Sequence, residues 1–210
     1  MKLRSLALVV AAGLALAGCA VNTAGPDSSP EEAAAAAYQH NGPTALTLYT
    51  MVNNRTGAGA HTSLMINAPS QRVVFDPAGS VRLRAVPEVN DVLYGITPRV
   101  KRFYESAHAR KTYHVRIQRI EVPPEVAARA LRMAQETGPV ASARCAASTS
   151  HILSQLPGFE NISGTWYPLK LSEQFSKLPG VEQSVLREND DDDKAIAIRE
   201  FEQELAQGGQ

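Results

Sequence analysis

Residues 45–76, ALTLYTMVNNRTGAGAHTSLMINAPSQRVVFD, hold three short apolar segments separated by turn-forming residues. The Asn/Gly-rich stretch at 53–59 predicts a loop, and the Ala-Pro-Ser-Gln stretch at 68–71 predicts a hairpin connection. Alternation of apolar and polar residues between these breaks is typical of half-buried strands. We therefore expect three consecutive antiparallel strands at Ala45–Val52, His61–Ile66 and Arg72–Asp76.

The rest of the chain adds helices and strands around this sheet. Further strands are predicted at 81–84, 113–122 and 181–186. Helices are predicted at 99–109, 124–136, 141–156, 169–178 and over the C-terminal pattern that contains Ile198, Phe201 and Leu205. The expected fold class is α+β, with an antiparallel sheet packed against the helix that bears Cys145.

Composition restricts the function classes. The chain has 210 residues with 21 Lys+Arg and 21 Asp+Glu, so its formal net charge is zero, and 44% of its residues are hydrophobic. These values predict one globular domain and argue against a nucleic-acid partner, which requires a basic excess. Two cysteines allow at most one disulfide.

The N-terminus has the pattern of a bacterial lipoprotein signal. Lys2 and Arg4 precede an apolar run that ends in Leu16-Ala17-Gly18-Cys19, which resembles a lipobox with Cys19 as the acylated residue. We therefore expect a signal peptide at 1–18 and a flexible tether at 19–44. The folded domain is expected at 45–189, and an acidic run with a C-terminal helix at 190–210, the four aspartates being a solvated helix start.

This N-terminus also predicts a location. Lipidation of Cys19 would anchor the chain to a membrane, facing the periplasm of the cell envelope. Ala20 follows the cysteine. By analogy with enteric lipoprotein sorting, this residue favours the outer membrane over the inner one.

Once Cys19 carries lipid, Cys145 has no partner within the chain and lies in an oxidising compartment. It follows a Gly-Pro break at the expected start of a helix, where backbone amides stabilise a thiolate. His61 opens a strand and is the candidate base, whereas His151 points to another side of the Cys145 helix and His108 and His114 are expected at the surface.

The order of a strand with His (HTSLMI), a return strand ending in Asp-Pro, and a late helix with Cys (RCAASTSHIL) resembles the circularly permuted branch of the papain-like, NlpC-type superfamily. This resemblance covers residues 45–185. It implies that Cys145 is the nucleophile and His61 the base. It also implies a polar residue on the next strand that orients the imidazole, for which Asp76 is the candidate.

The resemblance implies a lipid-anchored cysteine hydrolase acting on a peptidoglycan peptide amide or a lipid ester or amide. Asn54, before His61, and Trp166 are candidate substrate-binding residues, with loop capping and core packing as the alternatives. A non-catalytic binding or scaffolding lipoprotein of the same fold is the second hypothesis. A metal site built from His61, His108, His114 and Asp76 matches no tight ligand spacing, so no metal or cofactor is predicted.

Overall fold

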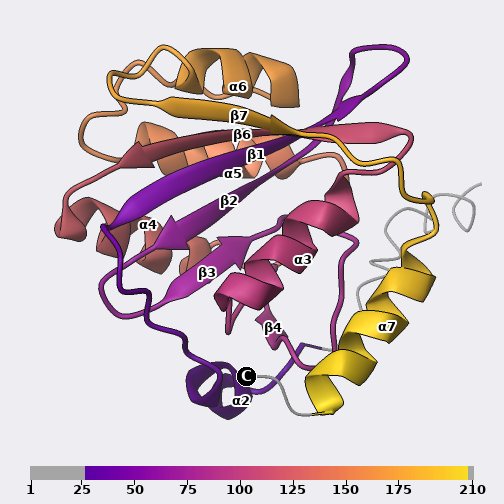
Figure 1. The fold of residues 1–210 in the computed structure, drawn as a ribbon. Helices are drawn as coiled ribbons and strands as arrows, with labels where there is room; N and C mark the ends of the chain where they lie inside the picture. Colours follow the sequence, from indigo (N-terminus) through magenta and orange to yellow (C-terminus); the bar gives the residue numbers. More distant parts are fainter. Residues whose placement is uncertain (1–26, 208–210) are drawn as a thin grey trace, which may run out of the picture.

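The computed structural model describes residues 27–207, which form an α+β fold around a single seven-stranded antiparallel sheet (Figure 1). The strands lie in the order β4-β5-β3-β2-β1-β6-β7, and every neighbouring pair is antiparallel. Their bounds are β1 Ala45–Asn53, β2 Gly59–Asn67, β3 Arg72–Phe75, β4 Glu88–Val89, β5 Val92–Leu93, β6 Tyr113–Glu121 and β7 Glu182–Leu186.

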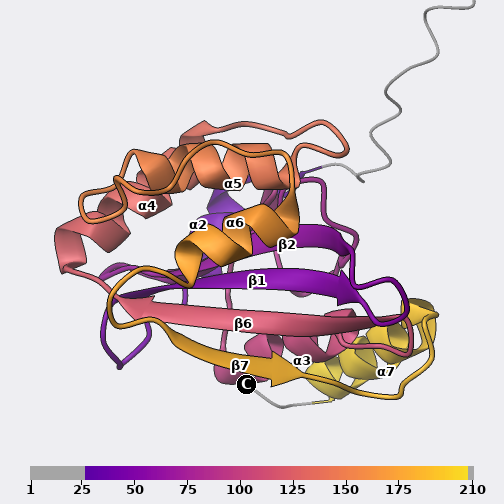
Figure 2. The same cartoon turned by 90° about the horizontal axis from the view of Figure 1, so that it is seen from above.

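Helices cover both faces of the sheet, as Figure 2 shows with α4, α5 and α6 on one side and α3 and α7 on the other. The helices of the described residues are α2 Pro30–Ala35, α3 Pro98–His108, α4 Pro124–Glu136, α5 Cys145–Ser154, α6 Pro168–Phe175 and α7 Lys194–Ala206. Each face therefore has its own apolar core, and the central strands are buried on both sides.

The alternation of side chains in β1 and β2 supplies both cores. Leu48 and Leu64 belong to the α4–α6 core, whereas Tyr49 and Met65 belong to the α3 core. Because helices cover both faces of the sheet, all residues of β1 except Asn53 are buried. A single-residue shift in register would exchange the two sets of side chains between the cores.

β2 is longer than its neighbour β3, and this difference leaves part of the edge of β2 uncovered. β3 pairs with β2 only from Leu64 to Asn67, so residues 59–63 of β2 extend past the end of β3. On its other edge this extension pairs with β1, where His61 lies opposite Met51. The N-terminus of α5 approaches the uncovered edge, where the Thr62 N–H hydrogen-bonds to the Cys145 sulfur.

Most of the predicted elements are confirmed, including the first three strands and the long strand before α4. The helix predicted at 141–156 is also present, but it begins only at Cys145 and ends at Ser154. The predicted strand at 81–84 is wrong, because this segment forms only an isolated bridge between Leu83 and Val86. The short strands β4 and β5 were not predicted. Their two-residue length leaves no periodicity to detect.

The prediction of a flexible tether is wrong for the described part of that segment, residues 27–44. Ala33 of α2 is buried in the core, and the Arg72 N–H donates to the Tyr38 carbonyl at 2.8 Å. Arg72 also lies over the Tyr38 ring at 5.0 Å. Backbone hydrogen bonds and one small buried residue therefore order a stretch with few large apolar side chains. The predicted signal peptide and Cys19 lie outside the described residues.

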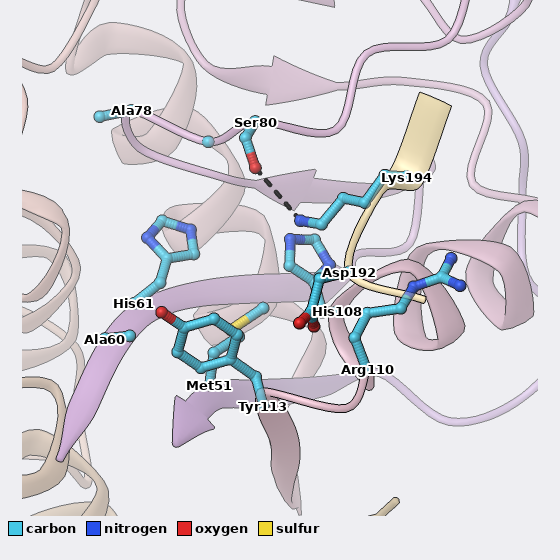
Figure 3. Close-up of a pocket in the computed structure, with 11 residues that line it drawn as sticks. Met51, Ala60, His61, Ala78, Ser80, His108, Arg110, Tyr113, Asp192 and Lys194 are labelled. Carbon is cyan, nitrogen blue, oxygen red and sulfur yellow. Dashed lines mark hydrogen bonds between the residues drawn. The ribbon is translucent and has the colours of Figure 1, made fainter. Parts of the chain in front are cut away.

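The C-terminal helix completes the second core. Phe201 of α7 stacks on Phe103 of α3 with ring centroids 4.1 Å apart, and Arg99 forms a 2.8 Å ion pair with Glu204. Asp193 caps α7 by accepting a hydrogen bond from the Ala195 N–H at 2.9 Å. The start of α7 is thereby held near the His61 end of β2, where Lys194 reaches Ser80 (Figure 3).

Candidate active site

Cys145 is the first residue of α5 and a free thiol, and the residue is only 6% exposed. No side chain caps this helix N-terminus, so its first amides are free to stabilise negative charge. Ala143, two residues earlier, has a φ of 65°, an unfavourable conformation for a residue with a Cβ. The chain thus turns sharply to bring the sulfur to the uncovered edge of β2.

His61 and Asp76 form a short hydrogen bond, with 2.6 Å between His61 Nε2 and Asp76 Oδ1. Asp76 directly follows β3, and its carboxylate is 3% exposed, compared with 19% for the His61 side chain. Because Nε2 is used by Asp76, Nδ1 is the ring nitrogen left for the hydrogen bond with Cys145. The structure therefore brings together Cys145, His61 and Asp76, the three residues expected to carry catalysis.

The electrostatics favour a charged imidazole. Burial by itself would lower the pKa of His61, but the Asp76 carboxylate and hydrogen bonds to Asp76 and Cys145 raise this pKa from 6.5 to about 10. Burial would likewise raise the pKa of Asp76, but the charge and hydrogen bond of His61 hold it below its ordinary value. At neutral pH the pair is therefore an imidazolium and a carboxylate.

The same arrangement activates the thiol. Burial would raise the pKa of Cys145, but the hydrogen bond and positive charge of His61 lower it below its ordinary value. The backbone N–H groups of Thr62 and Ala146 contribute two further hydrogen bonds to the sulfur. A thiolate held by an imidazolium and by helix N-terminal amides is a nucleophile suited to acyl transfer.

A second layer from α3 surrounds Asp76. The Tyr104 hydroxyl hydrogen-bonds the Ser63 hydroxyl at 2.7 Å and also hydrogen-bonds Asp76, which lowers the pKa of that carboxyl. His108 ends α3, and its ring stacks with that of His61 at a centroid distance of 6.3 Å. Burial lowers the pKa of His108 to about 4, so its ring is neutral.

The surface positions predicted for His108 and His114 are wrong. His108 is 5% exposed because it closes the α3 core, and His114 is buried beside Asn54, whose Oδ1 lies 2.7 Å from His114 Nδ1. The sequence signal was available for His108. It lies four residues after Tyr104, which places both side chains on the same face of α3.

Asp91, which was not predicted as a site residue from the sequence, holds the two loops that position the site. Its Oδ2 accepts hydrogen bonds from the N–H groups of Val140 at 2.7 Å and Ala78 at 3.3 Å. Its carbonyl accepts from the Asp76 N–H at 2.8 Å. Asp91 therefore ties the turn after Asp76 to the loop that leads to Cys145. The sequence signal was the Asn90-Asp91 dipeptide, because Asn and Asp favour turns and tolerate positive φ. Both residues have positive φ in the structure.

No protein-family model, curated protein or solved structure matches this chain. The site is therefore defined by its own geometry. Within residues 27–207, no cluster of three or more His, Cys, Asp and Glu side chains has an arrangement that could hold a metal ion. Over the same range, none of the helices is both long and apolar enough to cross a membrane.

The two candidate substrate-binding residues lie in different settings. Asn54 Nδ2 donates to the Arg110 carbonyl at 3.3 Å and the Lys111 carbonyl at 2.8 Å, so it braces a loop. Trp166 is 58% exposed and lies over the guanidinium of Arg144 at 5.2 Å, next to the N-terminus of α5. Trp166 therefore flanks the cysteine helix from the surface and is not packed in the core.

Gly79 has a close contact that makes it a test of the Asp76 position. A Cβ at residue 79 would overlap the carboxylate of Asp76, which is already fixed by His61 and Tyr104. We expect Gly79→Ala to displace the carboxylate, to weaken its hydrogen bond with His61 and to slow alkylation of Cys145 by iodoacetamide at neutral pH. Stability should fall by about 1–3 kcal/mol, the cost of disturbing a buried charged hydrogen bond.

The matched control is Gly164→Ala, because a Cβ at that position meets no atom within 4 Å. Urea unfolding and the alkylation rate, measured on both variants, check the prediction. An unchanged alkylation rate in Gly79→Ala would show that the carboxylate position does not control the thiol.

Proposed function

We propose that this chain is a cysteine hydrolase of the permuted papain-like type, cleaving an amide or ester through an acyl-enzyme. The observation that carries the proposal is the hydrogen-bonded series Cys145–His61–Asp76 at the N-terminus of α5. A nucleophile, a base within hydrogen-bond reach and a group that orients the base are the elements of a catalytic triad. The order of the residues, with the histidine before the cysteine, agrees with the permuted branch.

In this mechanism the Cys145 thiolate attacks the carbonyl carbon of the substrate. The oxyanion that forms is held by backbone N–H groups at the start of α5, including that of Cys145. The His61 imidazolium gives its proton to the leaving nitrogen or oxygen as the carbon–heteroatom bond breaks, which leaves a thioester. His61, now neutral, takes a proton from water as the oxygen attacks the thioester carbonyl. The carbon–sulfur bond then breaks, which releases the carboxylic acid and regenerates the Cys145 thiolate beside the imidazolium.

The proposal includes a membrane anchor at Cys19. Its support is the charged, apolar and small-residue pattern of residues 1–19. A diacylglycerol with an additional acyl chain gives stable attachment, since a single chain binds only marginally. The enzyme would then act at the envelope, facing the periplasm, on peptide or acyl substrates near the membrane.

A generic activated ester tests the proposed chemistry. We expect the full chain, purified in detergent, to hydrolyse p-nitrophenyl acetate and to carry an acetyl thioester on Cys145 that mass spectrometry detects. Cys145→Ser should reduce turnover about a hundredfold or more, because a serine hydroxyl is a far weaker nucleophile at this site. His151→Ala, on the exposed side of the same helix, is the matched control and should keep wild-type turnover.

The low exposure of Cys145 is the observation that favours the alternative, a non-catalytic binding module of the same fold. The two functions give different results in this experiment. A binding module would show no acetyl group on Cys145 and the same ester hydrolysis in wild type and Cys145→Ser. Acetylation without release would likewise contradict hydrolysis.

A further inference from the structure

A pocket with a volume of about 290 Å³ lies on the α3 and α7 side of His61 (Figure 3). His61 forms part of its wall, together with Met51, His108, Ser80 and Lys194. This volume is at the lower end of the range for ligand pockets, which favours a group the size of one or two amino-acid residues over a long acyl chain.

Lys194 gives the pocket an unsatisfied positive charge. Its Nζ donates to the Ser80 hydroxyl at 3.2 Å, and no carboxylate of residues 27–207 lies within ion-pair distance. Burial lowers the pKa of Lys194, and the charge of Asp76, which lies beyond ion-pair distance, opposes this shift without cancelling it. A bound anion would offset the cost of burying the ammonium.

The other charged groups around the pocket already have hydrogen-bond or ion-pair partners. Asp192 lines the pocket, but its two carboxylate oxygens accept hydrogen bonds from the Thr112 N–H at 3.0 Å and the Thr112 hydroxyl at 2.6 Å. Arg110 faces Asp190 at 3.5 Å, and His61 is paired with Asp76. Lys194 is therefore the cation lining this pocket that has no carboxylate within ion-pair distance among the described residues.

His108 offers a second unsatisfied group. His108 Nδ1 lies 2.8 Å from the Tyr104 carbonyl, to which it donates, whereas its buried Nε2 has no hydrogen-bond partner in the structure. Because this ring is neutral, Nε2 is an acceptor. Figure 3 shows the ring beside the end of Lys194, so a ligand carboxylate at the ammonium would bring a neighbouring N–H group to His108.

We propose that this pocket is a subsite that binds a carboxylate-bearing, amino-acid-sized group of the substrate, with Lys194 as its counter-ion and His108 as acceptor for an adjacent N–H. The inference rests on the proposed function, because it places this group beside His61. It favours a peptide substrate with a free carboxylate over a lipid acyl chain.

Binding is measured without catalysis through the methionine methyl groups. The chain has four methionines, of which Met51 lines the pocket and Met133 lies on α4 away from it. In the full chain labelled with ¹³C at the methionine methyls, N-acetylglycine should produce a saturable shift of the Met51 signal and none of Met133. N-acetylglycinamide, which lacks the carboxylate, should bind about tenfold more weakly or not at all.

Two variants at residue 194 separate charge from shape. Lys194→Gln should weaken N-acetylglycine binding about tenfold, the effect of losing one charge-assisted hydrogen bond, and Lys194→Arg should restore most of it. Equal binding of the acid and the amide, or unchanged binding in Lys194→Gln, would overturn the proposal. Equal binding of butanoate and N-acetylglycine would overturn the role of His108, because butanoate lacks the N–H group.

The experiment distinguishes failure of the subsite proposal from failure of the hydrolase proposal. Cys145→Ser should bind N-acetylglycine as the wild type does, since the thiol does not line this pocket. A Met51 shift without acetylation of Cys145 would support the subsite and contradict the hydrolase. Acetylation of Cys145 with no shift of the Met51 signal would support the hydrolase and contradict the subsite. A shift produced by octanoate alone would identify an acyl-chain pocket and overturn the peptide assignment.

Discussion

Replacing His61 by Gln is expected to slow alkylation of Cys145 by iodoacetamide about tenfold near pH 6.5. Without the imidazolium, burial dominates and the thiol pKa rises to its ordinary value or above. An ordinary thiol is only about 1% thiolate at that pH. Part of this loss is offset because a thiolate of higher pKa is intrinsically more nucleophilic. Gln is chosen because its amide can still donate to Asp76, which would otherwise become a buried unpaired carboxylate.

The dependence of the alkylation rate on pH should differ between wild type and His61→Gln. The wild-type rate should already be high below neutral pH, whereas the rate of His61→Gln should rise only as the pH approaches the ordinary cysteine pKa. The two rates should approach each other as the pH rises above about 9, because the thiol of His61→Gln then also becomes ionised. Exposed His151, replaced by Ala, serves as the control for loss of a histidine from the same region. Parallel profiles for wild type and His61→Gln would contradict an activated pair.

The parts of the site that the sequence predicted are those that local signals specify. The Gly-Pro break places Cys145 near a helix start, and the loop at 53–59 places His61 at a strand start. The position of Asp76 followed from the hairpin at 68–71, which sets the register of β3 against β2. Each of these three positions is determined by residues of the same helix or strand or of the loop next to it.

The parts that were not predicted depend on contacts between distant segments. Tyr104 reaches Asp76 from α3, and Lys194 reaches the pocket from the C-terminal helix. Neither residue stands in a motif, and the aspartates before Lys194 suggested only a solvated helix start. Periodicity identifies a buried face but not the element that packs on it. The second layer of the site therefore became visible only in the structure.

Asp76→Asn is expected to have the largest effect on stability. The change keeps the shape of the side chain but removes the charge that holds His61 protonated in a buried site. Breaking a buried pair by neutralising one partner costs about 3 kcal/mol, so the free energy of unfolding near pH 6 should fall by about that amount. Alkylation of Cys145 should fall to the level of His61→Gln, and the double variant should be no slower, because the two residues act as one unit.

The pH dependence of stability distinguishes this electrostatic role from a packing role. The pKa of His61 is raised in the folded protein, so its contribution is complete below the unfolded value of 6.5 and is lost as the pH rises through about 10. The lowered pKa of Asp76 gives a contribution that is lost only as the pH falls below its ordinary value of 3.8. The lowered pKa of Cys145 acts in the opposite direction up to the ordinary cysteine pKa of about 8.5. Urea unfolding of the wild type should therefore become easier mainly between about pH 8.5 and pH 10, whereas this loss should be absent in Asp76→Asn. Glu173→Gln, at an exposed carboxylate, should follow the wild type. A stability difference between wild type and Asp76→Asn that stays constant across this range would assign the loss to packing and contradict a charged His61–Asp76 pair.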